Sequence, residues 1–207
     1  MVVTISAEPY GNIPAILPRI GVHFHVDKQL SLAQWLGRGP LQNYLDAKMN
    51  APVGRWEGEV HTLNFLYDMP QETGNHEDVS ALTLSGASGK ISVIGLDTFS
   101  YSYHPVSLDN LTDAQHRNEL REDDRNHLYI DYRMRGLGSQ SCGPEPEEPY
   151  ELRAHAFRFS FAIAPTDFEQ AIQLARRDFG TKSARLSDDY VYQKPERIPQ
   201  IADCEIL

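Results

Sequence analysis

The chain of 207 residues is 41% hydrophobic and 10% aromatic, which is ordinary for a folded globular protein and excludes an extensively disordered one. Its 19 basic and 29 acidic residues give a net charge of −10. That charge repels phosphate backbones and anionic lipid, and no apolar run approaches the roughly 18 to 20 residues of a membrane span, so neither a nucleic-acid nor a membrane partner is expected.

Strands dominate the predicted elements, because apolar and polar residues alternate in several segments, with one face expected on the core and the other in solvent. The clearest segments are residues 20–26, 99–103 and 128–134. β-Branched and aromatic residues predict further strands at residues 2–7, 63–67, 79–84, 91–94 and 157–163. The polar residues expected to face solvent are His23, His25, Ser100, Ser102, Asp131 and Arg133. This spacing indicates a large antiparallel sandwich.

Helical signals are few. Thr112 is a candidate cap for a short turn through Glu119. Thr166 and Glu169 form a capping box ahead of an apolar stripe that continues to Phe179, where Gly180 is expected to end the helix.

The predicted domain organisation follows from these elements. We expect one sandwich domain over residues 1–165, and a C-terminal helix and polar tail over residues 166–207 packed on it. Two cysteines, Cys142 and Cys204, are too few for a disulfide framework and are interpreted as free thiols. The lack of a membrane span and of a signal pattern at the amino terminus predicts a cytoplasmic location.

Candidate site residues are sparse. His23 and His25 have the i, i+2 spacing that two metal ligands can use, but no Cys or carboxylate stands at a recognisable spacing, so no metal site is predicted. Glu72 is the most interesting carboxylate, because it lies in a polar, turn-prone loop. We favour a role in which it accepts hydrogen bonds from loop backbone N–H groups over a catalytic one.

A glycine-rich stretch covers residues 136–144. It is not interpreted as a phosphate loop, because no helix follows whose N-terminus could hold a phosphate. The glycines instead suit a bend at which the backbone approaches a ligand, with Cys142 projecting from the loop. Sequence supplies no base that would make Cys142 a nucleophile.

Five segments, taken in chain order, resemble motifs of one protein family. They are LPRIG at residues 17–21, WLGRGP with Asn43, Tyr44 and Asp46 at residues 35–46, PQE with Gly74, Asn75 and Asp78 at residues 67–79, IDYR at residues 130–133 ahead of Gly136, and the closing strands at residues 150–152 and 157–161. Over about residues 2–165 the chain resembles the C-terminal domain of glycoside hydrolase family 2 β-galactosidases, which also occurs as a separate small chain.

The resemblance implies an all-β fold: an antiparallel, galactose-mutarotase-like supersandwich, present in part, with a short C-terminal helix. In that family the catalytic acid and nucleophile belong to a barrel domain, so no catalytic residue and no cofactor is assigned to this chain, although Mg²⁺ or Na⁺ could be held by the catalytic partner. The glycine loop is implied to reach over the active-site mouth, where Gln140, Ser141 and Cys142 would bind the aglycone sugar.

Departures from the family pattern concern two loops. Cys142 stands where many members have a tryptophan that stacks on the sugar, and Gln42, Leu45 and Ala47 replace the usual Glu, Pro and Arg. The matching motif residues are implied to shape loops rather than to react; they are Arg19, Gly37, Gly39, Pro40, Asn43, Tyr44, Glu72, Gly74 and Asn75.

The sequence therefore predicts a component of a β-galactosidase that acts on terminal β-D-galactosides such as lactose, with two carboxylates supplied by a catalytic polypeptide or by catalytic domains. The isolated chain is expected to be inactive. One alternative is a free-standing carbohydrate-binding or mutarotase-like module, suggested by the tyrosines at 101, 103, 129 and 132. Another is a purely structural interface domain, and self-association into a homo-oligomer stays open.

Overall fold

The computed structural model describes residues 1–138, 143–177 and 201–206. Its strands are β1 (Val2–Ala7), β2 (Arg19–Asp27), β3 (Leu32–Arg38), β4 (Val53–Glu59), β5 (His76–Gly86), β6 (Gly89–His104), β7 (Arg125–Met134), β8 (Phe157–Ala164) and β9 (Ile201–Ile206). Its helices are α1 (Leu108–Asp113) and α2 (Phe168–Ala175), with 3-10 turns η1 (Arg117–Glu119) and η2 (Glu148–Tyr150). Among these described helices, none has the length and apolar character needed to cross a membrane.

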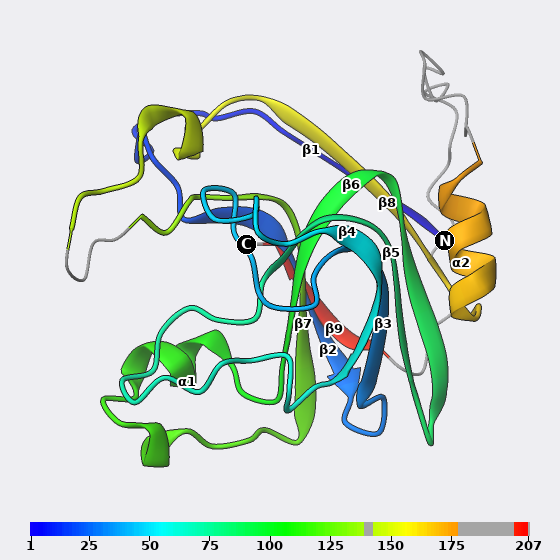
Figure 1. Ribbon diagram of the computed structural model, residues 1–207. Coiled ribbons are helices and arrows are strands. Elements are labelled where there is room, and N and C mark those ends of the chain that lie inside the picture. The colour runs from blue at the N-terminus through cyan, green and yellow to red at the C-terminus, as the bar shows by residue number, and fades with distance from the viewer. Residues whose placement is uncertain (139–142, 178–200, 207) are drawn as a thin grey trace.

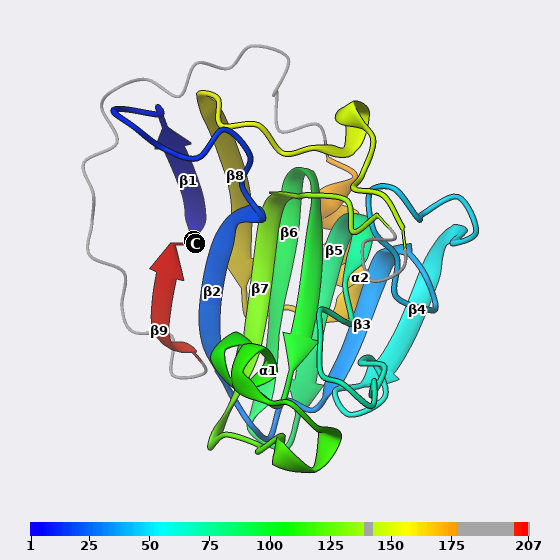
Figure 2. The ribbon, with the colours of Figure 1, turned by 90° about the vertical axis from the view of Figure 1, so that its left-hand side faces the viewer.

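All strand pairs are antiparallel, and most strands follow the order β4-β3-β5-β6-β7-β2-β9. Strand β6 has 16 residues and takes part in two layers. Ser92 to Gly95 pair with β8, which in turn pairs with β1, whereas Ser100 to His104 pair with β7. Figure 2 shows β8 behind β7 and β2, so the two layers face each other as a sandwich.

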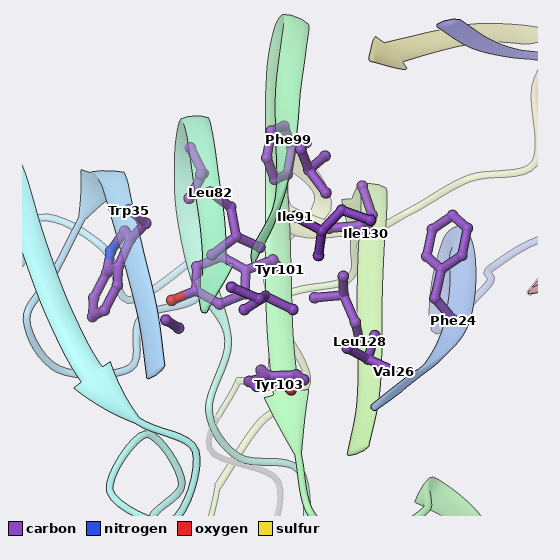
Figure 3. Packing of buried hydrophobic residues seen from close by; sticks show 14 of the residues in the cluster. Phe24, Val26, Trp35, Leu82, Ile91, Phe99, Tyr101, Tyr103, Leu128 and Ile130 are labelled. Carbon is purple, nitrogen blue, oxygen red and sulfur yellow. The ribbon is translucent and has the colours of Figure 1, made fainter. Parts of the chain in front are cut away.

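The core fills the space between these layers. It is formed by the apolar residues of the period-two segments. Figure 3 shows seven of them: Phe24, Val26, Phe99, Tyr101, Tyr103, Leu128 and Ile130. From the second layer, Phe161 of β8 packs edge-on to Phe24 of β2 at a centroid distance of 6.2 Å. The expectation of an antiparallel all-β sandwich with a short C-terminal helix is therefore confirmed.

Helix α2 covers the other face of the β5–β6 pair (Figure 1). Its Ala171 and Ile172 are buried against Ala81 and Ile94. The predicted cap was wrong by one residue: Asp167, not Thr166, accepts the Gln170 backbone N–H at 2.9 Å. A carboxylate at this position satisfies a free helical N–H and interacts favourably with the helix dipole. The predicted end at Phe179 and Gly180 lies outside the described residues.

The short helix was also misplaced in the sequence prediction. Helix α1 begins after Ser107, whose side chain accepts the Asn110 backbone N–H, and Thr112 lies in its last turn. The Thr112 hydroxyl, which was expected to cap the start of a helix, instead donates to the Leu108 carbonyl one turn earlier, at 2.8 Å.

Three strand predictions also need correction. Residues 63–67 form a loop, because the Asn64 side chain donates to the Val60 and Tyr103 carbonyls, and Thr73 Oγ1 accepts the Phe65 N–H, in place of ladder bonds. Residues 91–94 and 99–103 belong to one strand, β6. Strands β3 and β4 were not predicted, and neither was β9, which pairs with β2 where a polar tail was expected.

The polar face of the central strands is not solvated as expected. Ser100 and Ser102 are 2% and 0% exposed, Asp131 is 0% exposed and His23 is 7% exposed. The segment that carries α1 lies in front of this face of the sheet (Figure 2), and the loop before β5 lies beside that segment, with Glu72 near Arg19 and Asp131. Alternation identified the two faces correctly, but long loops bury the second one.

Candidate functional site

Four of the five segments that resemble family motifs meet on the covered polar face, through Arg19, Tyr44, Glu72 and Asp131. At its centre the Arg19 guanidinium donates to the Asp131 carboxylate at 2.8 Å and lies 4.9 Å from the centre of the Tyr129 ring. Burial raises the pKa of Asp131, and Arg19 offsets part of this effect by favouring the charged form. The side chains of Arg19 and Asp131 are 9% and 0% exposed, so they form a buried ion pair.

Glu72 lies beside this pair. Its Oε1 atom is buried and has no hydrogen-bond partner within the described residues. Burial raises the pKa of Glu72 to about 7, and Arg19 and the Thr73 backbone N–H offset part of the effect. Burial and the nearby Glu72 carboxylate likewise raise the pKa of Tyr44. The arrangement joins the loop before β5 to the start of β2.

Asn43 and Asn75 lock the two covering loops together. The Asn43 N–H donates to the Asn75 carbonyl at 2.7 Å, and the Asn75 side chain donates to the Asn43 carbonyl at 2.8 Å and to Glu77 Oε1 at 2.9 Å. The Glu77 N–H in turn donates to Asn43 Oδ1 at 2.9 Å. Burial raises the pKa of Glu77 to about 7, although the Asn75 amide and Lys48 favour its charged form.

Gln42 has a defined task in place of the usual glutamate. Its Oε1 accepts both the Thr73 hydroxyl and the Gly74 N–H at 2.8 Å, and its Nε2 donates to the Tyr67 hydroxyl at 2.9 Å. A glutamate could accept the first two bonds but could not donate the third. Gln42 therefore closes the loop with three hydrogen bonds, although a glutamate could keep the third by accepting from the Tyr67 hydroxyl.

Glycine is required at two motif positions. Gly74 has φ +77°, and a Cβ there would lie 2.2 Å from Asn64 Oδ1. A Cβ on Gly39 would lie 2.7 Å from the Trp56 ring, whose indole N–H donates to the Gly37 carbonyl at 3.1 Å. Pro40 follows through a cis peptide bond.

Asp78 ends the motif segment with a charged cluster. Its carboxylate accepts from Arg38 Nε at 2.5 Å and from Lys48 at 2.9 Å. Burial alone would raise the pKa of Asp78, but the hydrogen bonds from Arg38 and Lys48 together have the larger effect and lower it. The Arg38 guanidinium also donates to the Lys48 and Ala51 carbonyls at 3.0 and 2.9 Å, which fixes the loop before β4.

Asp46 connects this loop to the glycine-rich stretch. Its carboxylate accepts the Gly138 N–H at 2.6 Å and the Leu137 N–H at 3.2 Å. The Gly136 N–H donates to the Tyr150 carbonyl at 2.8 Å. The base of the glycine loop is therefore fixed on both sides, whereas Gln140, Ser141 and Cys142 lie outside the described residues.

Histidines form the one group in the described part of the chain with the composition of a transition-metal site. His23, His25 and His127 offer ligand atoms that all lie within 4.8 Å of one another. The first two were singled out in the sequence, but His127 was not, because its proximity depends on the pairing of β2 with β7.

The tyrosines that suggested a sugar-binding module are core residues. Tyr101 and Tyr103 are 0% exposed and Tyr129 is 2% exposed. The Tyr103 hydroxyl donates to the Leu30 carbonyl at 2.7 Å and accepts from the Asn126 amide at 2.9 Å. These three rings present no face to a ligand in solvent, whereas Tyr132 is half-buried, so three of the four tyrosines no longer favour an independent sugar-binding module.

Comparison with known proteins agrees with this set of motifs. A family model described as "Beta galactosidase small chain" matches residues 1–163. The chain belongs to this family. It is 34% identical to the β-galactosidase of Staphylococcus xylosus over 147 residues, which are 71% of this chain and 15% of that protein.

Two further relatives give the same result. The chain is 35% identical to the β-galactosidase of Arthrobacter sp. (strain B7) over 158 residues, 73% of this chain and 16% of that protein. It is 31% identical to that of Kluyveromyces lactis over 152 residues, 73% of this chain and 15% of that protein. This small-chain domain thus spans about 15% of the length of the curated relatives it matches.

Sequence reasoning missed the contacts of three carboxylates at the candidate site. Asp131 was expected in solvent, and Asp46 was quoted in a motif without a role. Glu77 was not considered, although it lies two residues after Asn75. For Asp131 and Glu77, which lie in strands, the available signal was an acidic residue inside a β-like segment, because a carboxylate in a strand is costly unless it is paired.

Proposed function

We propose that this small-chain domain forms part of the active-site mouth of a β-galactosidase and contacts the aglycone sugar of substrates such as lactose, while the acid and the nucleophile reside in another part of the enzyme. The observation that carries the proposal is the anchoring of the glycine loop by Asp46. A loop fixed at its base presents its tip to a ligand at a small entropic cost.

The buried carboxylates support a catalytic centre located elsewhere. Retaining hydrolysis needs two carboxyl groups about 5 to 5.5 Å apart, both reaching the sugar. Asp131 is 0% exposed and pairs with Arg19, and Glu77 is 8% exposed and bonds Asn75. Neither carboxylate is accessible to a substrate. Their ion pair and hydrogen bonds fit a structural role in holding the covering loops.

Exposed apolar side chains on the covering loops support contact with the rest of such an enzyme. The largest are Leu41, Met49, Phe65 and Met69, which are 78%, 91%, 61% and 66% exposed. Exposed apolar side chains on these loops are surface that contact with the rest of such an enzyme would bury. We also propose that the assembly lies in the cytoplasm, as the sequence predicts.

The first test is hydrolysis of lactose and of an aryl β-galactoside by the purified chain, alone and together with a catalytic polypeptide of the family. We expect turnover only in the mixture or in an intact enzyme. Robust turnover by the isolated chain would contradict the proposal, and calorimetric binding of galactose or lactose to the chain alone would favour an independent sugar module.

Within the active assembly, Asp46→Ala should lower kcat/KM for lactose by about tenfold, because the loop loses two hydrogen bonds to a charged acceptor. The effect on an aryl galactoside should be smaller, since its leaving group is not a sugar. Asp97→Asn, at an exposed position of β6, is the matched control. Equal losses for both substrates would show that Asp46 supports folding and not aglycone contact.

A further inference from the structure

Three histidines meet on the covered face of the β2–β7 pair. His25 lies directly opposite His127 in the strand register, and His23 lies two residues before His25 on the same face of β2. Directly opposed residues of an antiparallel pair have Cβ atoms only about 4.5 to 5.5 Å apart. Strand pairing alone therefore brings three imidazoles together.

The rings approach closely enough to share a ligand. His23 Nε2 lies 3.0 Å from His127 Nδ1, and the ligand atoms of all three histidines lie within 4.8 Å of one another. His23 and His127 are 7% and 4% exposed, whereas His25 is half-buried. The buried His23 and His127 are thus held in place by packing, whereas the half-buried His25 can change its side-chain conformation.

Asp123 orients one of these imidazoles. Its Oδ2 lies 2.8 Å from His127 Nε2 and also accepts the Ser107 N–H at 3.1 Å. A carboxylate that holds one ring nitrogen directs the other nitrogen toward the histidine group and increases its basicity. This carboxylate–imidazole pair is a second observation, independent of the three-histidine cluster, that fits a metal ligand.

We propose that His23, His25 and His127 bind one divalent first-row transition metal, with Zn²⁺ as the first choice, and that Asp123 positions His127. Imidazole suits Zn²⁺, Cu²⁺ and Ni²⁺, whereas Mg²⁺ and Ca²⁺ prefer oxygen ligands. With metal–nitrogen distances of about 2.0 to 2.1 Å, two ligands are at most about 4.2 Å apart. The half-buried His25 closes the remaining distance by a side-chain rotation.

The site lies apart from the loops assigned to the sugar. It joins β2 and β7 to the segment between β6 and β7, because Asp123 and Ser107 both belong to that segment. A bound ion would therefore hold this segment on the sheet and stabilise the folded state by mass action.

The test uses the tag-free full chain, stripped with a chelator and titrated calorimetrically with Zn²⁺, and with Co²⁺ as a visible-absorption probe. We expect one ion per chain, Co²⁺ bands of four-coordinate intensity, and a rise in melting temperature with Zn²⁺ but not with Mg²⁺. Asp123→Asn should weaken Zn²⁺ binding by about 10- to 100-fold. His25→Gln should weaken it further and reduce the Co²⁺ band.

His116→Gln is the matched control, because His116 is exposed and contacts a carboxylate, Glu119, at 3.1 Å. It should leave the affinity unchanged. His25 and Asp123 are both partly exposed, so their variants should fold, which circular dichroism checks. Absence of stoichiometric Zn²⁺ binding, or equal affinities of the His25→Gln and His116→Gln chains, would overturn the proposal.

Discussion

The apolar cluster between the two layers and the polar network beneath the covering loops are built from the same strands. In β7, Ile130 belongs to the apolar cluster and Asp131 to the polar network. In β6, Tyr101 likewise belongs to the cluster and Ser102 to the network. The cluster gains stability from buried area, which many side chains supply interchangeably. The network depends on particular pairs, so the loss of one partner leaves another uncompensated.

The largest expected effect is in the cluster. Phe161 is 0% exposed and contacts Phe24 and Phe159, so Phe161→Ala should lower the free energy of unfolding by about 3 to 5 kcal/mol. Urea denaturation measures the change. Phe65→Ala, at a ring that is 61% exposed, should change it by less than about 1 kcal/mol. Equal effects at both positions would refute the assignment of this cluster as the core.

The network should respond differently to a nearly isosteric change. Asp131→Asn preserves the volume but removes the hydrogen-bonded counter-ion of the buried Arg19, and should cost about 3 kcal/mol. Asp113→Asn, at an exposed position, is the control. Replacing both Arg19 and Asp131 with apolar residues should cost less than the sum of the single changes, and simple additivity in that double-mutant cycle would argue against a coupled pair.

The smallest effect is one of pH, and it isolates a single carboxylate. Burial raises the pKa of Glu77 from 4.5 to about 7, so the folded chain holds a proton that the unfolded chain releases. This stabilisation is complete below about pH 4.5 and is lost as the pH rises to about 7.

Glu77→Gln, which stays neutral, should therefore match the parent chain near pH 4.5 and exceed its stability by on the order of 2 kcal/mol above pH 7. Melting temperatures between pH 4 and 8 measure the difference. Glu8→Gln, at an exposed position, should show no such trend. A constant difference between the Glu77 variant and the parent would show that Glu77 is charged in the folded state.

Much of the fold could be predicted from the sequence, because burial of alternate residues leaves a period-two pattern in β2, β6 and β7. The strands β3 and β4 were not predicted, since Gly and charged residues such as Gly37 and Glu57 hide the alternation, and β9 was expected to be part of a polar tail. Helix caps were misplaced by a few residues, because several candidate capping residues stand close together before α1 and α2.

Less of the candidate site could be predicted. The motifs identified Asn43, Glu72 and Asn75, but not that they cover a buried ion pair. The roles of Asp131 and His127 depend on which strands are neighbours and which loops lie over them, and local periodicity does not contain that information. A polar residue in a strand has the same sequence signature whether water or a guanidinium faces it.

The position of strand β6 affects how the domain unfolds. One continuous strand pairs with β5, β7 and β8, so the two layers share a backbone and neither can open without breaking bonds in the other. The sandwich should therefore unfold as one cooperative unit, and a destabilising substitution in either layer should lower the stability of both.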